Sequence, residues 1–239
     1  LGKSYGEISA ESRSQHKSQG FGVPATRGEA LEYFKATKGD QPVNDMMDGI
    51  DLTGMRLPGG ESIAATINDL IKNFDLLYPE RSVEGLVKLH RMIKELPEGN
   101  WKTQKQKDVV QLIAQCSGLF LDVTTTEQFA VQTDSIRMNF VFNNRLGTDA
   151  VLQKVTVDNF DSSFSRALER NRNVSFAKTL FVPADKPITQ PYWLDKKKEE
   201  GYFNVTDQSQ IGLPDVAPSY NAAVQIKIYG DLFTFIRTV

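Results

Sequence analysis

The sequence is poor in the residues that most often do chemistry. It contains two histidines, His16 and His90, and one cysteine, Cys116, in 239 residues. Neither histidine has a metal-ligating partner at suitable spacing, so we expect no zinc site within this chain. A single cysteine excludes an internal disulfide framework. Nucleophile-elbow, phosphate-loop and C-x-x-C motifs are also missing, so we expect this chain alone to be no enzyme and to hold no cofactor.

The sequence also lacks long apolar runs and a strong net charge. No run approaches the roughly 20 apolar residues that a membrane-spanning helix needs, so we expect no transmembrane segment. The net charge of −2 and the pI near 5.8 give no reason to expect a nucleic-acid partner. The chain starts at Leu1 without a methionine or a signal peptide, which we interpret as a cut inside a longer protein or as a processed or engineered start.

The first segment has the pattern of a capped helix over residues 4–19. Ser4 and Glu7 match the S-x-x-E capping box, and Gly20 and Gly22 follow at the predicted end. The stripe that should be apolar is half polar, because at helical spacing it contains Tyr5, Ile8, Ser12, His16 and Gln19. We therefore expect this helix to pack on a partner surface, and we expect that surface to be solvated or functional.

The next part predicts a strand at residues 30–37, a loop from Met46 to Gly60, and then helices. Three amphipathic stretches follow one another, marked by Ile63–Phe74, Val83–Ile93 and Val109–Cys116. Pro97 and Gly118 end the second and third stretches. Short links join them, so we predict a small helical bundle over residues 61–118.

Beyond Gly118 the apolar pattern changes to the period of two that is typical of strands. Alternation is found in residues 136–142, 174–182 and 224–228, and residues 232–239 are rich in β-branched and aromatic side chains. We predict an immunoglobulin-like antiparallel β-sandwich over residues 119–239, with a proline-rich excursion at 184–218. The predicted fold class is therefore α+β, with a helical segment before the sandwich.

Aromatic side chains in the excursion form two clusters. Tyr192 and Trp193 follow Pro191, and Tyr202 lies further along the same segment. Exposed aromatic rings on such a loop can stack on sugars, which would make the sandwich a carbohydrate-binding module. The alternative is that these rings fasten the excursion to the sheet by burial. His90 and Cys116 lie on apolar helix faces, where structural roles are expected.

Three segments together resemble one protein family. Residues 4–22 (SYGEISAESRSQHKSQGFG) resemble the closing helix of PIG-L (LmbE-like) deacetylase domains, which follows the last metal ligand of that family. Residues 188–194, 202–206 and 211–214 are similar to the C-terminal region of long PIG-L proteins of the Bacteroidetes. Residues 116–122 resemble the junction into that region. The resemblance covers the whole chain.

This resemblance implies a metal-dependent parent enzyme whose catalytic motifs are absent here. The family binds zinc through an Ala-His-Pro-Asp-Asp motif and hydrolyses an N-acetyl group, typically of N-acetylglucosamine, with metal-activated water. Neither that motif nor the second His-containing motif occurs in this chain. Ser12, His16 and Gln19 match the family's closing helix, and we expect them on one helical face near the substrate, with no metal bound.

The leading hypothesis is an accessory C-terminal region of such a deacetylase. Residues 1–60 would be the tail of the missing catalytic domain with a linker, and the rest would pack on that domain or help to present a glycan to it. The alternative is a stand-alone β-sandwich module that binds carbohydrate or protein. The resemblance implies a periplasmic or secreted parent protein, with zinc in the missing catalytic domain.

Overall fold

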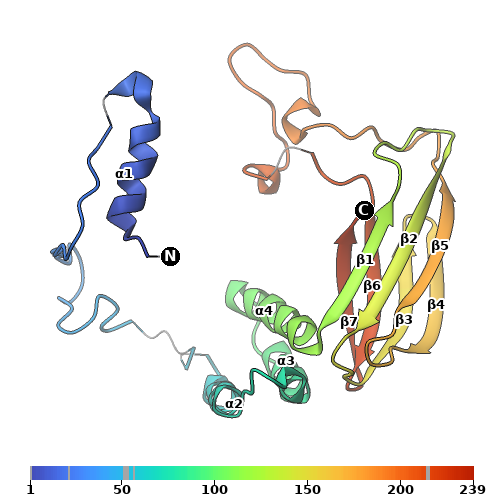
Figure 1. Cartoon of the computed structure of the whole chain (residues 1–239), viewed down its shortest axis with the longest axis horizontal. Coiled ribbons are helices and arrows are strands. Elements are labelled where there is room, and N and C mark those ends of the chain that lie inside the picture. The colour runs from blue at the N-terminus through green and yellow to red at the C-terminus, as the bar shows by residue number, and fades with distance from the viewer. Residues whose placement is uncertain (1, 21, 51–53, 56, 214–215) are drawn as a thin grey trace. The chain divides into compact units, whose positions relative to one another are not determined.

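The computed structural model describes residues 2–20, 22–50, 54–55, 57–213 and 216–239 (Figure 1). The chain divides into two compact units, residues 1–51 and residues 52–239, which we describe one after the other. Phe21 and Pro214, which belong to the segments that resemble the PIG-L family, lie outside the described residues.

Unit 1 begins with helix α1 (Tyr5–Gln15), whose predicted capping box is confirmed. The Ser4 hydroxyl accepts a hydrogen bond from the Glu7 backbone N–H at 3.2 Å, and the Glu7 carboxylate accepts one from the Ser4 N–H at 2.9 Å. These two bonds satisfy N–H groups that the first turn of a helix leaves free.

The predicted continuation of this helix to Gln19 is wrong. The helix ends at Gln15, because His16 has φ −80° and ψ 56°, and a separate 3₁₀ turn η1 (Lys17–Gln19) follows. The returning chain is fastened by the Ser14 hydroxyl, which accepts a hydrogen bond from the Val23 N–H at 3.2 Å. A helix without an apolar stripe gains little from packing, so a local turn can replace its last residues.

The strand predicted at residues 30–37 is also wrong, because these residues form no regular element. Tyr33 is 88% exposed, and Leu31 and Phe34 are exposed as well. A strand needs a neighbour for its backbone groups, and the described part of this unit contains no strand. Of the predicted loop from Met46 to Gly60, residues 51–53 and 56 lie outside the described residues.

Unit 2 starts with the three predicted helices, which are confirmed as α2 (Gly60–Lys72), α3 (Val83–Lys94) and α4 (Asn100–Ser117). A 3₁₀ turn, η2 (Pro79–Ser82), precedes α3. Helix α4 ends at Gly118, which has the left-handed conformation (φ 60°) that glycine adopts without steric cost. The buried Lys102 ammonium of α4 donates a hydrogen bond to the Leu96 carbonyl at 2.8 Å, beyond the end of α3.

Seven strands follow in the described residues and form two antiparallel sheets, which confirms the α+β class. One sheet has the order β1-β2-β5 and the other β4-β3-β6-β7. Three strands coincide with the predicted alternation and a fourth with residues 232–239; of the other three strands, one precedes these four and two lie among them. The strands are β1 (Leu119–Thr125), β2 (Ser135–Asn144), β3 (Ala150–Val157), β4 (Phe160–Ala167), β5 (Val174–Phe181), β6 (Asn221–Ile228) and β7 (Asp231–Thr238).

The two sheets face each other across an aromatic core. The ring of Phe140 on β2 stacks on Phe176 of β5 at 4.6 Å and lies 5.8 Å from Phe160 of β4, in the other sheet. Phe164 and Phe176 make a second contact between the sheets at 5.5 Å. The inward side chains therefore fill one continuous layer, as in a two-sheet sandwich.

The helices belong to the same core as the sheets. Ile93 of α3 and Ile113 of α4 are buried in the cluster that also contains Phe140. Helix α3 also meets the β6–β7 hairpin, where the Arg91 guanidinium pairs with the Asp231 carboxylate at 2.7 Å. The expectation of a separate N-terminal bundle is thus corrected: α2 to α4 share their apolar faces with the sandwich and have no core apart from it.

The segment between β5 and β6 contains the predicted proline-rich excursion. Its described residues form two short 3₁₀ turns, η3 (Tyr192–Leu194) and η4 (Gln208–Gln210), and two isolated bridges, from Pro191 to Val216 and from Glu199 to Tyr202. At its start, the Lys186 ammonium lies 3.8 Å from the centre of the Tyr220 ring. In the described parts of the chain, no helix has the length and apolar character needed to cross a bilayer.

Candidate functional site

One end of the sandwich is organised by a buried asparagine. The Asn144 amide nitrogen donates hydrogen bonds to the Thr148 carbonyl at 2.7 Å and to the Leu168 carbonyl at 2.8 Å. Its amide oxygen accepts from the N–H groups of Gly147 and Thr148. The Asn144 backbone carbonyl accepts from the N–H of Asn171 at 2.8 Å. One residue therefore holds the β2–β3 and β4–β5 loops together, so that both loops are fixed before any ligand arrives.

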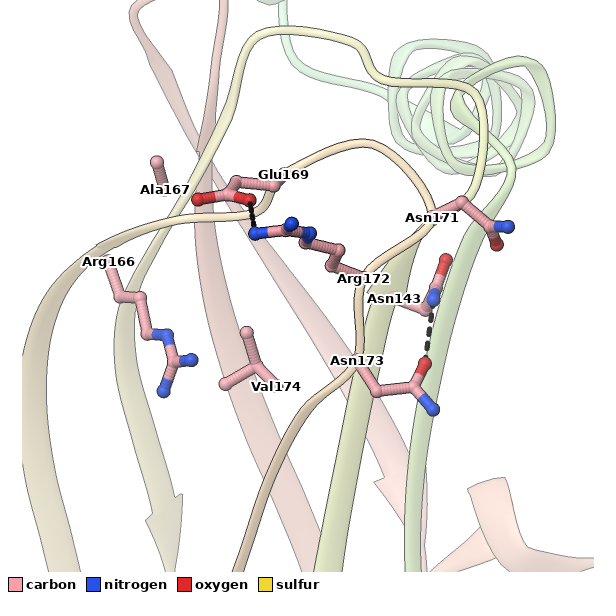
Figure 2. Close-up of a pocket in the computed structure, with 8 residues that line it drawn as sticks. All are labelled: Asn143, Arg166, Ala167, Glu169, Asn171, Arg172, Asn173 and Val174. Atoms are coloured by element: carbon pink, nitrogen blue, oxygen red, sulfur yellow. Dashed lines mark hydrogen bonds and ion pairs between the residues drawn. The ribbon is translucent and has the colours of Figure 1, made fainter.

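Beside these loops lies a pocket of about 650 Å³, which we call the arginine pocket (Figure 2). It opens where β4 and β5, the edge strands of the two sheets, approach the loop between them. Val174 is buried and lies between the two sides of the pocket. The lining residues are Asn143, Arg166, Ala167, Glu169, Asn171, Arg172, Asn173 and Val174.

The pocket contains one paired and one unpaired guanidinium. Arg172 forms an ion pair with Glu169 at 2.7 Å, with both side chains largely exposed. Arg166 lies opposite the buried Leu152 in the strand register, at the end of β4. Within the described residues, the Arg166 side chain has no ion-pair or hydrogen-bond partner. The lining therefore carries one positive charge in excess, and Arg145 and Arg170 in the same two loops add to the positive potential.

Two amides complete the opposite side of the pocket. The Asn143 nitrogen donates to the Asn173 oxygen at 2.7 Å, as Figure 2 shows. The Asn143 amide oxygen is buried without a hydrogen-bond partner among the described residues. Among the described residues, the Asn173 nitrogen has no acceptor, so it can donate to a ligand. The site thus presents guanidinium and amide donors to a ligand.

The structure brings together two of the three residues that match the family's closing helix. His16 and Gln19 line one hollow of about 440 Å³ in unit 1, together with Arg13, Gly20, Gly22 and Val23. Ser12 is exposed on α1 and is not among those lining residues. Because the helix ends at Gln15, the three side chains do not share one helical face. Their proximity to a substrate stays a prediction.

The aromatic residues of the excursion lie apart from the arginine pocket's lining. Tyr192 and Trp193 are half-buried, with ring centres 4.9 Å apart and ring planes at 85°, and the Tyr192 hydroxyl accepts a hydrogen bond from the Gly212 N–H. This edge-on geometry offers no flat platform made of both rings. Tyr202 is exposed. Stacking of a glycan on these three residues stays a prediction.

His90 and Cys116 lie in half-buried positions, as core-facing side chains of α3 and α4 do. The His90 ring is 5.1 Å from Phe233, and burial lowers the pKa of His90 below its usual value, although the nearby Asp231 acts in the opposite direction. Burial raises the pKa of the Cys116 thiol, so its nucleophilic thiolate is disfavoured. Across the described ranges, no three His, Cys, Asp or Glu side chains are grouped so as to hold a metal ion.

Sequence reasoning missed the arginine pocket. Its residues come from the ends of β2 and β4, from the start of β5 and from the intervening loop, so no short motif contains them. A signal is nevertheless present: residues 166–173 contain three arginines and two asparagines. Asn143 and Asn144, read from the sequence, indicate only a turn.

Comparison with known proteins adds no family. No protein-family model matches the chain, and no curated protein matches it. Its function is therefore inferred from the resemblance described above and from the geometry of the two units.

Proposed function

We propose that this chain is the accessory, non-catalytic C-terminal region of a zinc-dependent N-acetyl deacetylase of the PIG-L type, where it packs on the catalytic domain of the same polypeptide. The parent protein would be periplasmic or secreted, as the resemblance implies. The strand orders β1-β2-β5 and β4-β3-β6-β7 support the immunoglobulin-like form of the sandwich in this proposal.

The observation that carries the docking role is an exposed apolar surface at the end of α2. Leu76 and Leu77 are 82% and 80% exposed, and Ile71 is 69% exposed. Phe74 and Tyr78 lie in the same stretch and are exposed as well. We call these five residues the 71–78 surface. Contiguous apolar side chains of this size at a protein surface mark an interaction site more often than isolated ones do.

The backbone of this surface is held in place. The Asp75 carboxylate accepts a hydrogen bond from the Leu77 N–H at 2.9 Å, and the Asp75 carbonyl accepts one from the Tyr78 N–H at 3.1 Å. The Arg81 guanidinium lies 4.2 Å from the centre of the Tyr78 ring. A turn that is already ordered loses little conformational entropy when a partner covers it, which favours docking.

The test starts from the coding sequence immediately upstream of Leu1. We expect it to continue in frame into an Ala-His-Pro-Asp-Asp motif. N-acetyl hydrolysis is then measured for the full-length protein and for a Leu76→Lys/Leu77→Lys variant. A matched control is Ile188→Lys in the proline-rich excursion, where the side chain is 81% exposed.

We expect the double variant to lower the activity or the thermal stability of the catalytic domain, because two ammonium groups would be buried at the contact. The Ile188 variant should leave both unchanged. A start codon or signal peptide directly before Leu1, or equal behaviour of all three proteins, would contradict the docking role.

A second candidate, a stand-alone β-sandwich module that binds carbohydrate, is favoured by the arginine pocket. The pocket is lined by donors that suit a polar ligand and is built on loops that Asn144 fixes. This candidate predicts that the chain alone binds a saccharide.

A further inference from the structure

The arginine pocket has the composition of a site for a ligand that is both anionic and rich in hydroxyls. Its volume of about 650 Å³ is far larger than a single oxyanion requires. Its charge is supplied by guanidinium groups, whose planar forks match carboxylate and phosphate oxygens. Amide groups of Asn143 and Asn173, which suit hydroxyls, lie on the other side.

Arg166 is the group that points to an anion. Along the described chain it has no acidic partner, whereas the neighbouring Arg172 is neutralised by Glu169 at 2.7 Å. Arg166 is exposed near the end of β4 and lines the pocket shown in Figure 2. A guanidinium without a counter-ion, beside a preformed hollow, is a ready partner for a ligand oxyanion.

The Asn143–Asn173 amide pair suits hydroxyl groups. The Asn143 nitrogen donates to the Asn173 oxygen at 2.7 Å, which holds the two amides in place on one side of the pocket. The adjacent Asn173 amide nitrogen offers a donor for the same ligand.

We infer that the arginine pocket binds an acidic sugar, a pyranose that carries a carboxylate or a phosphate. The oxyanion pairs with Arg166, and the ring hydroxyls reach the amides of Asn143 and Asn173. The pocket lining contains no aromatic residue, so a neutral sugar would have no ring to stack on. This inference rests on the binding-module candidate and is independent of the 71–78 surface.

The test is a titration of the whole chain followed by NMR, with glucuronate, glucose 6-phosphate, glucose, acetate and inorganic phosphate as probes. We expect glucuronate or glucose 6-phosphate, or both, to shift the side-chain amide signals of Asn143 and Asn173. Which of the two binds more tightly identifies the oxyanion as carboxylate or phosphate. Equal binding of glucose, equal binding of acetate or inorganic phosphate, or no binding by any probe would overturn the inference.

Three variants sharpen this test. Arg166→Ala should weaken binding at least tenfold, and Arg166→Lys should weaken it less, because a single charge without the fork remains. Arg137→Ala, an exposed arginine near the start of β2 and outside the pocket lining, is the matched control and should leave the affinity within twofold. Unchanged thermal unfolding of each variant shows that the fold is intact.

Glu169→Gln provides a gain-of-function test that a purely structural role would not produce. The substitution removes the ion pair to Arg172 and frees a second guanidinium, so the acidic sugar should bind about two- to fivefold more tightly. Unchanged or weaker binding by this variant would contradict the claim that guanidinium charge in the pocket binds the ligand oxyanion. Failure of the titration leaves the docking test unaffected, since that test measures hydrolysis by the full-length protein.

Discussion

The two units use apolar residues in opposite ways. In unit 1, Ala10 is the only buried apolar side chain among the described residues, whereas Leu31, Tyr33 and Phe34 are exposed. In unit 2, side chains from α3, α4 and both sheets form one core. Both units contain aromatic and aliphatic residues, so composition alone does not make a core. Periodic placement of those residues does.

This contrast predicts that unit 2 determines the stability of the chain. The largest effect is expected for Phe140→Ala, which empties space between the sheets next to Phe176 and Phe160. We expect a loss of about 3–5 kcal/mol in the free energy of unfolding, measured in urea. The matched control is Phe34→Ala in unit 1, whose side chain is 66% exposed. Phe34→Ala should change the free energy of unfolding by no more than about 0.5 kcal/mol. Equal losses in the two variants would contradict the contrast between the units.

The second prediction concerns polar anchors. Asn144→Ala removes a buried side chain that satisfies groups on two loops, so we expect a loss of about 2–3 kcal/mol by chemical denaturation. Asp48→Ala is the counterpart in unit 1, where the carboxylate accepts from the N–H groups of Val43 and Asn44 at 2.9 and 2.7 Å. This exposed turn lies outside the core, so Asp48→Ala should leave the denaturant midpoint of the main unfolding transition unchanged.

The third prediction compares two glycines with positive φ. Gly118→Ala places a Cβ about 3.0 Å from Leu146 in the left-handed C-cap of α4, and should cost roughly 1–2 kcal/mol. Gly39 in unit 1 has φ +85°, and a Cβ added there would have no other heavy atom within 4 Å. Gly39→Ala strains the backbone as well, but unit 1 lies outside the core, so the thermal midpoint should stay unchanged; an equal shift in both variants would contradict the contrast.

The smallest predicted effect is a pH dependence from His90. Burial lowers its pKa in the folded protein below the ordinary value near 6.5, so the unfolded chain binds more protons just below that value. Stability should therefore fall as the pH is lowered from 6.5 toward the folded pKa. His90→Gln should reduce this fall, as followed by thermal unfolding between about pH 7 and pH 5. His16→Gln, in the exposed cap of α1, is the control and should leave the profile unchanged.

The same contrast explains which parts of the structure the sequence predicts. The three helices of unit 2 follow from apolar spacing at 3.6 residues, β2, β5 and β6 follow from alternation, and β7 follows from its β-branched and aromatic residues. Strand β4 does not stand out individually in the sequence, because Ser162 lies between Phe160 and Phe164 on its partly buried side and weakens the alternation. The strand expected at residues 30–37 fails because short apolar runs do not specify a pairing partner.

The candidate site is harder to predict than the fold for a physical reason. The arginine pocket forms only when the ends of β2, β4 and β5 meet, and sequence spacing does not reveal which strand ends meet. The buried Asn144 side chain joins the two loops at these strand ends by hydrogen bonds. In a sequence, however, asparagine indicates a turn more readily than a buried residue that joins two loops. By contrast, the capping box of α1 is local, and the prediction of its two hydrogen bonds is confirmed.

Amide hydrogen exchange on the dilute, whole chain tests the central contrast most directly. We predict slow exchange in β2, β3 and β6 and in α3 and α4, with the slowest amides reporting one global opening. Residues 5–15 should exchange fast, because α1 buries only Ala10 and needs a partner surface. Strong protection along α1 in the monomer, comparable with that of β6, would contradict the contrast between the two units.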